Sequence, residues 1–185
     1  MCTCKNSKEK KEALTLSKTI LYILNPEKYF KGVIRLIKKD TKNKNIVYVT
    51  TNKPYDHITN VFKKARINSD NFFFIDCISK HIGKDIEKEP KNCVYIDGPQ
   101  NLTTLSVAIN ESLKHFAKEK ILILDSLSTL LIYHDSRTIG RFSNFFINKM
   151  RSADVDTIIL ALESDIDKDI IKQIESFVDE VKKYG

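Results

Sequence analysis

Short runs of consecutive apolar residues recur along the chain from about residue 18 onwards. Each run is five or six residues long, is rich in β-branched and aromatic side chains, and does not alternate with polar residues. Runs of this kind are typical of strands that are covered on both faces of a sheet. We therefore expect strands at residues 19–24, 46–51, 72–77, 93–97, 121–125 and 157–162.

Between most of these runs, apolar residues recur at spacings of three and four, which is typical of helices with one buried face. The expected buried stripes are Phe30, Val33, Ile34 and Ile37; Ile58, Val61, Phe62 and Ala65; Leu105, Ile109, Leu113 and Phe116; Ile139, Phe142, Phe146 and Met150; and Ile170, Ile171, Ile174, Phe177, Val178 and Val181. Residues 78–91 are charged and are expected to form a loop. Alternating strands and helices predict an α/β three-layer sandwich, with a mostly parallel sheet of about six strands and helices on both faces.

Length and composition fit a single domain over residues 18–185, preceded by a flexible basic tail over residues 1–17. The chain has 185 residues, of which 42% are hydrophobic and 30% charged, as in ordinary globular proteins. No run approaches the roughly 20 apolar residues of a membrane span, and the N-terminus lacks the apolar core of a secretory signal. We expect a cytoplasmic protein without a membrane segment. Cys2 and Cys4 lack the partners of a zinc site, so no metal site is expected.

Basic and acidic residues are concentrated in different parts of the chain. The formal net charge is +7, yet residues 27–66 hold eleven Lys or Arg against three acids, and residues 154–185 hold nine acids against four Lys. Such an asymmetry can steer a charged partner or favour head-to-tail association of copies of the chain. Solvated helix faces produce the same pattern.

The first junction between a strand and a helix does not have the sequence of a phosphate-binding loop. Ligands of parallel α/β proteins bind beyond the carboxyl ends of the strands, where glycine-rich turns expose backbone N–H groups to phosphate. Here Asn25 is a good helix N-cap, Pro26 suits the first helical position, and Glu27 lies near the positive end of the helix dipole. Glu27 opposes an anion and Pro26 lacks an N–H. The sequence therefore predicts a structural helix start at this junction.

The run at residues 121–125 carries the best candidate for chemistry. It ends in Asp125, which is followed by Ser126. Many nucleoside triphosphatases hold magnesium with an aspartate and a hydroxyl at this position, although aspartate also caps turns. Asp125, Ser126 and the nearby Lys53 are therefore candidates for binding Mg–ATP. A pairing of His134 with Asp125 for acid–base chemistry is a further alternative.

Two segments resemble the RecA-like ATPase superfamily, in particular its archaeal circadian-clock and recombinase-paralogue-like branch. NIVYVTTNKPYDHITNVFKKARI resembles the family's second strand and helix, and KILILDSLSTLLIYHDSRTIGRFSNFFINKMRSADVDTIILALES resembles its Walker B segment. The resemblance covers about residues 18–182 and implies a RecA-like core. The chain is also similar to archaeal domains of unknown function that share this core and lack its phosphate-binding loop.

The departures from the RecA-like pattern predict that the chain does not hydrolyse ATP. The family's glycines, lysine and hydroxyl are missing between residues 24 and 30, and Thr51, Asn52 and Lys53 stand where the family places its catalytic glutamate. Asparagine cannot act as a general base. The family combines a phosphate-binding loop, a catalytic glutamate and an aspartate at the end of a strand. Of these three elements, only the aspartate remains, as Asp125. We therefore expect a non-catalytic domain that acts in regulation or signalling through protein–protein contacts, either with an unidentified partner or with further copies of itself.

Two alternatives stay open at this point. One is an unconventional nucleotide-binding protein or weak ATPase that uses Asp125. The other is sequence-independent binding of nucleic acid through the basic region, because cations on two helices can contact phosphates. The candidate contacts are Lys28, Lys31, Arg35, Lys38, Lys63, Lys64 and Arg66.

Overall fold

The computed structural model describes residues 17–86, 89–117, 119–163 and 168–184. The expected basic tail, with Cys2 and Cys4, lies outside the described residues apart from its last residue. Within the described part of the chain, no helix has the length and apolar character needed to cross a bilayer.

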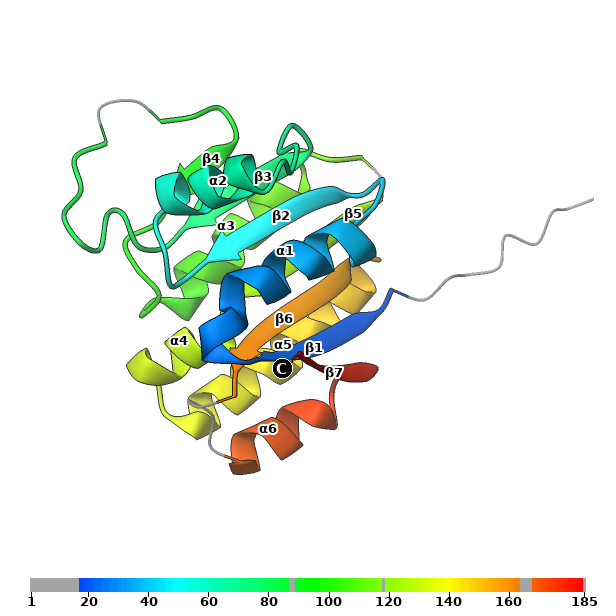
Figure 1. The fold of residues 1–185 in the computed structure, drawn as a ribbon. Coiled ribbons are helices and arrows are strands. Elements are labelled where there is room, and N and C mark those ends of the chain that lie inside the picture. The colour runs from blue at the N-terminus through cyan, green and yellow to red at the C-terminus, as the bar shows by residue number, and fades with distance from the viewer. Residues whose placement is uncertain (1–16, 87–88, 118, 164–167, 185) are drawn as a thin grey trace, which may run out of the picture.

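A seven-stranded sheet forms the middle layer of the molecule (Figure 1). Its strands lie in the order β4-β3-β2-β5-β6-β1-β7, and every neighbouring pair is parallel. The strands are β1 (Thr19–Leu24), β2 (Asn45–Thr50), β3 (Phe72–Asp76), β4 (Cys93–Tyr95), β5 (Lys120–Asp125), β6 (Asp156–Leu162) and β7 (Glu180–Tyr184). The expected parallel sheet is confirmed.

Helices cover both faces of the sheet, as the alternation of apolar segments predicts. They are the 3-10 helix η1 (Pro26–Lys28) and the α-helices α1 (Tyr29–Asp40), α2 (Tyr55–Lys64), α3 (Leu102–Leu113), α4 (Leu127–Tyr133), α5 (Ser136–Ser152) and α6 (Lys168–Glu175). In Figure 1, α1 and α2 lie in front of the sheet, and α3 and α5 lie behind it. The α/β three-layer architecture is therefore confirmed.

Successive residues of the strands enter two separate apolar cores. In β1, Tyr22 and Leu24 belong to the core under α1 and α2, whereas Leu21 and Ile23 belong to the core under the helices of the other face. All four side chains are buried. Because both faces are covered, the strands contain no polar alternation, which explains the continuous apolar runs in the sequence.

The last strand and the last helix differ from the sequence-based expectation. Residues 170–181 were expected to form one helical stripe, but α6 ends at Glu175 and Val181 lies in β7, which pairs with β1 at the edge of the sheet. Val181 fits a helical spacing as well as a strand, and the neighbouring Lys182 and Lys183 interrupt the apolar run that identified the other strands. Charged residues are common in edge strands, because they discourage pairing with further strands.

Two other helices also depart from the expected pattern. In α1 the buried residues are Tyr29, Gly32, Val33, Leu36 and Ile37, whereas Phe30 and Ile34 are half-buried, so the expected stripe was placed about one residue away from the true face. Residues 127–133, where no helical stripe was expected, form the short helix α4.

The strand order places a topological switch point between β2 and β5. From β2 the chain continues through α2 to β3 on one side, and from β5 it continues through α4 and α5 to β6 on the other. In open α/β sheets a crevice for ligands forms where neighbouring strands send their connections to opposite sides. Asp125 ends β5 directly opposite Thr50 of β2, so this residue lies at the switch point.

Candidate functional site

Asp125 is buried at the carboxyl edge of the sheet, and only 1% of its surface is exposed. Both of its carboxylate oxygens accept hydrogen bonds from tyrosine hydroxyls. Tyr29, at the start of α1, donates to Oδ1, and Tyr48, in the middle of β2, donates to Oδ2. Tyr48 is fully buried and Tyr29 nearly so. We call Asp125, Tyr29 and Tyr48 the carboxylate lock.

Burial dominates the electrostatics of the lock. It raises the pKa of Asp125 to about 6, and the two tyrosine hydroxyls and the charge of Lys53 limit that rise. The pKa values of Tyr29 and Tyr48 are raised well above the ordinary value, first by burial and then by the charge of Asp125. Both hydroxyls therefore keep their protons and act as donors to the carboxylate.

Thr51 closes the crevice between β2 and β5 beyond the lock. Its backbone N–H donates to the carbonyl oxygen of Asp125 at 2.6 Å, and its Oγ1 accepts from the backbone N–H of Ser126 at 2.8 Å. The same Oγ1 lies 3.0 Å from the carbonyl oxygen of Ser126. The two strand ends are thus joined directly where a ligand of this fold class would enter.

The structure brings the three nucleotide candidates to one edge, where the side chains of Asp125 and Ser126 have partners within the protein. Ser126 Oγ lies 3.2 Å from Thr129 Oγ1 on α4. Lys53 is half-buried, and its backbone N–H and carbonyl oxygen both bond to the hydroxyl of Thr50. Its charge acts on Asp125 through space and lowers the pKa of that carboxyl. Within the described residues, no three His, Cys, Asp or Glu side chains are grouped to hold a metal ion.

The junction that follows β1 has the capped form predicted from the sequence. Asn25 Oδ1 accepts from the backbone N–H of Glu27 at 2.9 Å, and Pro26 begins η1. The chain then continues into α1, whose first residue is Tyr29. The difference from expectation is that the first turn is a 3-10 helix. This turn sets the position from which Tyr29 reaches Asp125.

His134 and Asp76 have other roles at this edge. His134 Nε2 lies 3.2 Å from the carbonyl oxygen of Pro99, whereas both oxygens of Asp125 bond to the two tyrosines, so the acid–base pair of His134 with Asp125 is not formed. Asp76, at the end of β3, is fully buried and accepts from the backbone N–H groups of Tyr55, Ile78 and Ser79. It fixes the start of α2 and the turn that follows β3.

The nucleic-acid candidates lie at the end of η1, on the solvent side of α1 and α2, and just after α2. Every one of them is exposed: Lys28, Lys31, Arg35, Lys38, Lys63, Lys64 and Arg66. The structure therefore separates the nucleotide candidates, which are held inside the protein edge, from the basic candidates, which are open to solvent.

Sequence reasoning found Asp125 but missed Tyr29 and Tyr48. Both tyrosines read as members of apolar segments, because the rings contribute to the core under α1 and α2. A usable signal was nevertheless present. A tyrosine at a fully buried position needs a partner for its hydroxyl, and an aspartate at a strand end is a suitable acceptor.

Comparison with known proteins agrees with the fold and leaves the activity open. A family described as a family of unknown function (DUF7504) matches residues 33–182. The crystal structure of a KaiC-like protein from the hyperthermophilic archaeon Pyrococcus horikoshii is similar with a TM-score of 0.54 and 16% sequence identity, covering 89% of this chain and 69% of that one. No curated protein matches the sequence. The expected α/β fold is confirmed, since the KaiC-like structure shares it.

The raised pKa of Asp125 predicts a pH dependence of stability that Asp125→Asn removes. The unfolded chain releases this proton near the ordinary pKa of 3.8, whereas the folded chain holds it to about pH 6. The free energy of unfolding therefore falls as the pH rises through this window. Relative to Asp125→Asn, the wild type should lose about 2 kcal/mol between about pH 4.5 and 7.5. Urea unfolding of both proteins across this range measures the difference, and two parallel pH profiles would contradict the burial of an ionisable Asp125.

The lock also predicts that each tyrosine hydroxyl stabilises the fold. Tyr29→Phe and Tyr48→Phe each remove one donor from the buried carboxylate and should each lower the free energy of unfolding by about 1–3 kcal/mol at neutral pH. Tyr133→Phe is the matched control, because it removes the same atom from a side chain that is 39% exposed. Equal effects of all three substitutions in urea unfolding would show that the lock does not contribute.

Proposed function

The chain belongs to this family of unknown function, DUF7504, and we propose that it is a non-catalytic RecA-like domain that acts in regulation or signalling through contacts with other proteins. The observation that carries the proposal is the carboxylate lock. Asp125 is the residue at which magnesium would be held, and both of its oxygens are occupied by the hydroxyls of Tyr29 and Tyr48. A cation would have to share this carboxylate, which is only 1% exposed, with the two tyrosine hydroxyls.

The surroundings of the lock also support a domain without a phosphate cradle. Glu27 lies at the start of η1, and Pro26 has no N–H to offer there. The P-loop of RecA-like ATPases is in this view replaced by a capped helix whose first α-helical side chain, Tyr29, fills the space above Asp125. Phosphoryl transfer depends on positioned charge around the phosphates, which these residues do not offer. The residues present therefore do not fit Mg–ATP.

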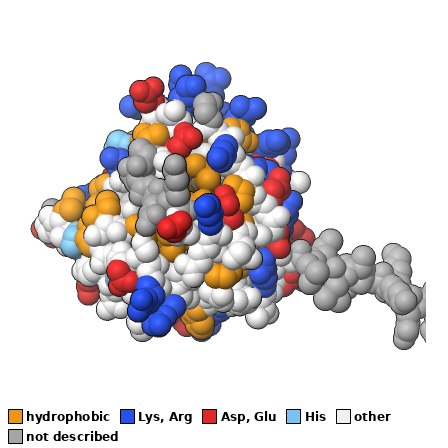
Figure 2. All heavy atoms as spheres, turned by 90° about the horizontal axis from the view of Figure 1, so that it is seen from below, with side chains coloured by type: hydrophobic (Ala, Val, Ile, Leu, Met, Phe, Trp, Pro, Cys, Tyr) orange, Lys and Arg blue, Asp and Glu red, His pale blue; other side chains and the backbone are white. Residues whose placement is uncertain are grey.

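A surface formed by α4 and the segment after β3 supports contact with another protein. On α4, Ile132 is 76% exposed and Tyr133 is 39% exposed, and the segment after β3 adds Ile82, which is 62% exposed. The rings of Tyr133 and His81 lie 5.6 Å apart, so this segment contacts α4. In Figure 2, hydrophobic and histidine side chains gather at the left of the molecule, on the side where Figure 1 places α4. Exposed apolar residues of this kind are suited to the centre of a protein interface.

Titration with Mg–ATP tests the non-catalytic part of the proposal. A ligand at 100 times its dissociation constant stabilises a protein by about 2.7 kcal/mol, which corresponds to a rise of about 5–10 °C in Tm for a chain of this size. We expect no such rise at about 5 mM Mg–ATP, and no hydrolysis above that of Asp125→Asn. Hydrolysis that the wild type performs and Asp125→Asn does not would instead establish the alternative, a weak ATPase that uses Asp125.

Substitution of Ile132 tests the proposed contact with other proteins. Ile132→Asp should leave Tm unchanged within about 1 °C, because the side chain is exposed, and should abolish the association of the chain with its partner. Val107→Asp on α3 is the matched control, since Val107 is 56% exposed. Light scattering detects a second copy as the partner, and quantitative co-purification from the cells that make the protein detects another protein. Association that survives Ile132→Asp as well as it survives Val107→Asp would place the contact elsewhere.

A further inference from the structure

The outward face of α1 carries a continuous row of basic side chains. Lys31, Arg35, Lys38 and Lys42 follow one another at spacings of four, three and four residues, so they lie along one side of the helix and its C-terminal extension. All four are exposed, and Lys28 and Lys39 flank them. We call these six residues the basic row.

No ion pair among the described residues neutralises the basic row. Among the described residues, ion pairs within 4 Å involve Lys18, Lys44, Lys80, Lys84, Lys114, Arg151 and Lys182, and none involves a member of the row. Two nearby acids have other partners. Asp40 accepts from the Tyr22 hydroxyl at 2.7 Å and lies 3.9 Å from Lys182, and Asp56 pairs with Lys84. Like charges three and four residues apart repel one another along a helix, so the row is suited to an external anion.

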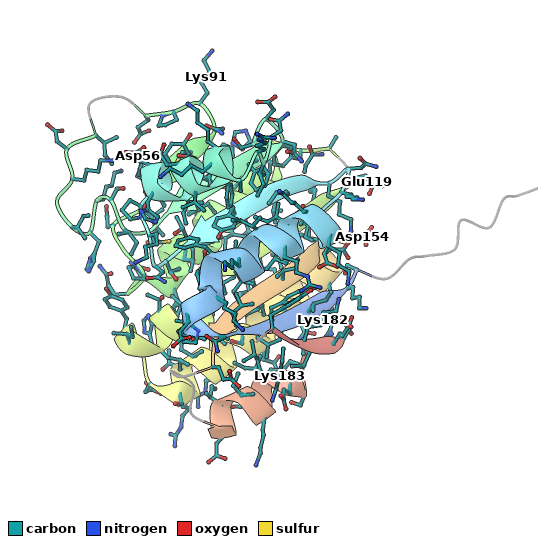
Figure 3. All side chains as sticks on the ribbon, in the orientation of Figure 1. Asp56, Lys91, Glu119, Asp154, Lys182 and Lys183 are labelled. Carbon is teal, nitrogen blue, oxygen red and sulfur yellow. The ribbon has the colours of Figure 1, made fainter. Side chains whose placement is uncertain are left out.

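The row borders an open hollow and is partly fixed by the edge strand. Lys31, Ile34, Arg35, Lys38, Lys39 and Lys42 line a hollow of about 620 Å³. The guanidinium of Arg35 lies 5.2 Å from the ring centroid of Tyr184, and that ring stacks on Tyr22 at 5.4 Å. Lys182, labelled on β7 in Figure 3, lies 5.3 Å from the centroid of the Tyr22 ring. The cation–π contact with Tyr184 restricts the side chain of Arg35.

We propose that the basic row binds the phosphate backbone of nucleic acid without sequence preference. At a rise of 1.5 Å per residue, the helical stretch from Lys31 to Lys38 spans about 10 Å, the length of about three base-pair steps of a duplex, and Lys42 extends the row beyond the end of α1. Four or more cations then face a strand of closely spaced phosphates. Figure 2 shows Lys and Arg side chains gathered at the upper edge of the molecule, the side on which α1 lies.

The composition of the row distinguishes nucleic acid from an acidic protein as the occupant. Interfaces between proteins are depleted in lysine and depend on buried aromatic or apolar anchors, whereas interfaces with nucleic acid are strongly positive. In the hollow, Ile34 is the single apolar side chain among five cations. This binding site is separate from the carboxylate lock and from α4, so it does not depend on the proposed function.

Fluorescence anisotropy with a labelled duplex of about 30 base pairs, from about 50 to 300 mM KCl, tests the proposal. The test variant is Lys31→Gln/Arg35→Gln/Lys38→Gln, and the matched control is Arg137→Gln/Arg141→Gln/Lys149→Gln on α5, which removes the same charge from another helix with its own open hollow. Wild type and control should bind with a steep salt dependence. In the test variant, the slope of log K against log salt should become shallower by about 3, and affinity near 100 mM salt should fall on the order of 100-fold.

Melting curves establish that all three proteins are folded before binding is compared. Equal losses in the test variant and the control would attribute binding to net charge alone and overturn the proposal, as would the absence of wild-type binding at about 50 mM salt. Polyglutamate is the competitor that represents an acidic protein. It should displace the duplex poorly; displacement at an equal concentration of negative charge would assign the row to an acidic protein instead.

Discussion

A carboxylate that is buried at the edge of a sheet must have both oxygens satisfied, and the arrangement around Asp125 follows from that requirement. Tyr48 satisfies one oxygen from the neighbouring strand, and Tyr29 satisfies the other from the first turn of α1. For Tyr29 to reach the carboxylate, the chain must turn into a helix directly after β1, which the cap at Asn25 achieves. The same bonds occupy the point where a ligand enters folds of this class. One buried group thus links the path of the chain after β1 to the proposed absence of a nucleotide site.

Helix α1 has different roles on its two sides. Its inner side carries Tyr29 and the core residues, while its outer side carries cations that no described acid neutralises. Three acids of the C-terminal region, Asp156, Asp179 and Glu180, form ion pairs within the protein.

The extent to which the sequence predicted this structure depended on how local each signal was. Strands buried on both faces and the capped turn at Asn25 are encoded within a few residues, and both were predicted correctly. β7 was missed because Val181 fits a helix as well as a strand, and its edge position depends on pairing with β1, which is distant in sequence. The lock was missed because Tyr29, Tyr48 and Asp125 come from three separate segments, and only the fold brings their polar atoms together. Of the three residues, only Asp125 could be predicted from the sequence, because an aspartate at the end of an apolar strand is a local pattern.

The central claim is that tyrosine hydroxyls, and not a nucleotide with its metal, occupy the carboxylate of Asp125. The most direct measurement is a crystal structure of the full chain grown with millimolar magnesium and a non-hydrolysable ATP analogue. The account predicts Tyr29 and Tyr48 on the two oxygens of Asp125, with no nucleotide at the start of α1. An analogue bound above η1, with Tyr29 rotated away and magnesium beside Asp125, would contradict it.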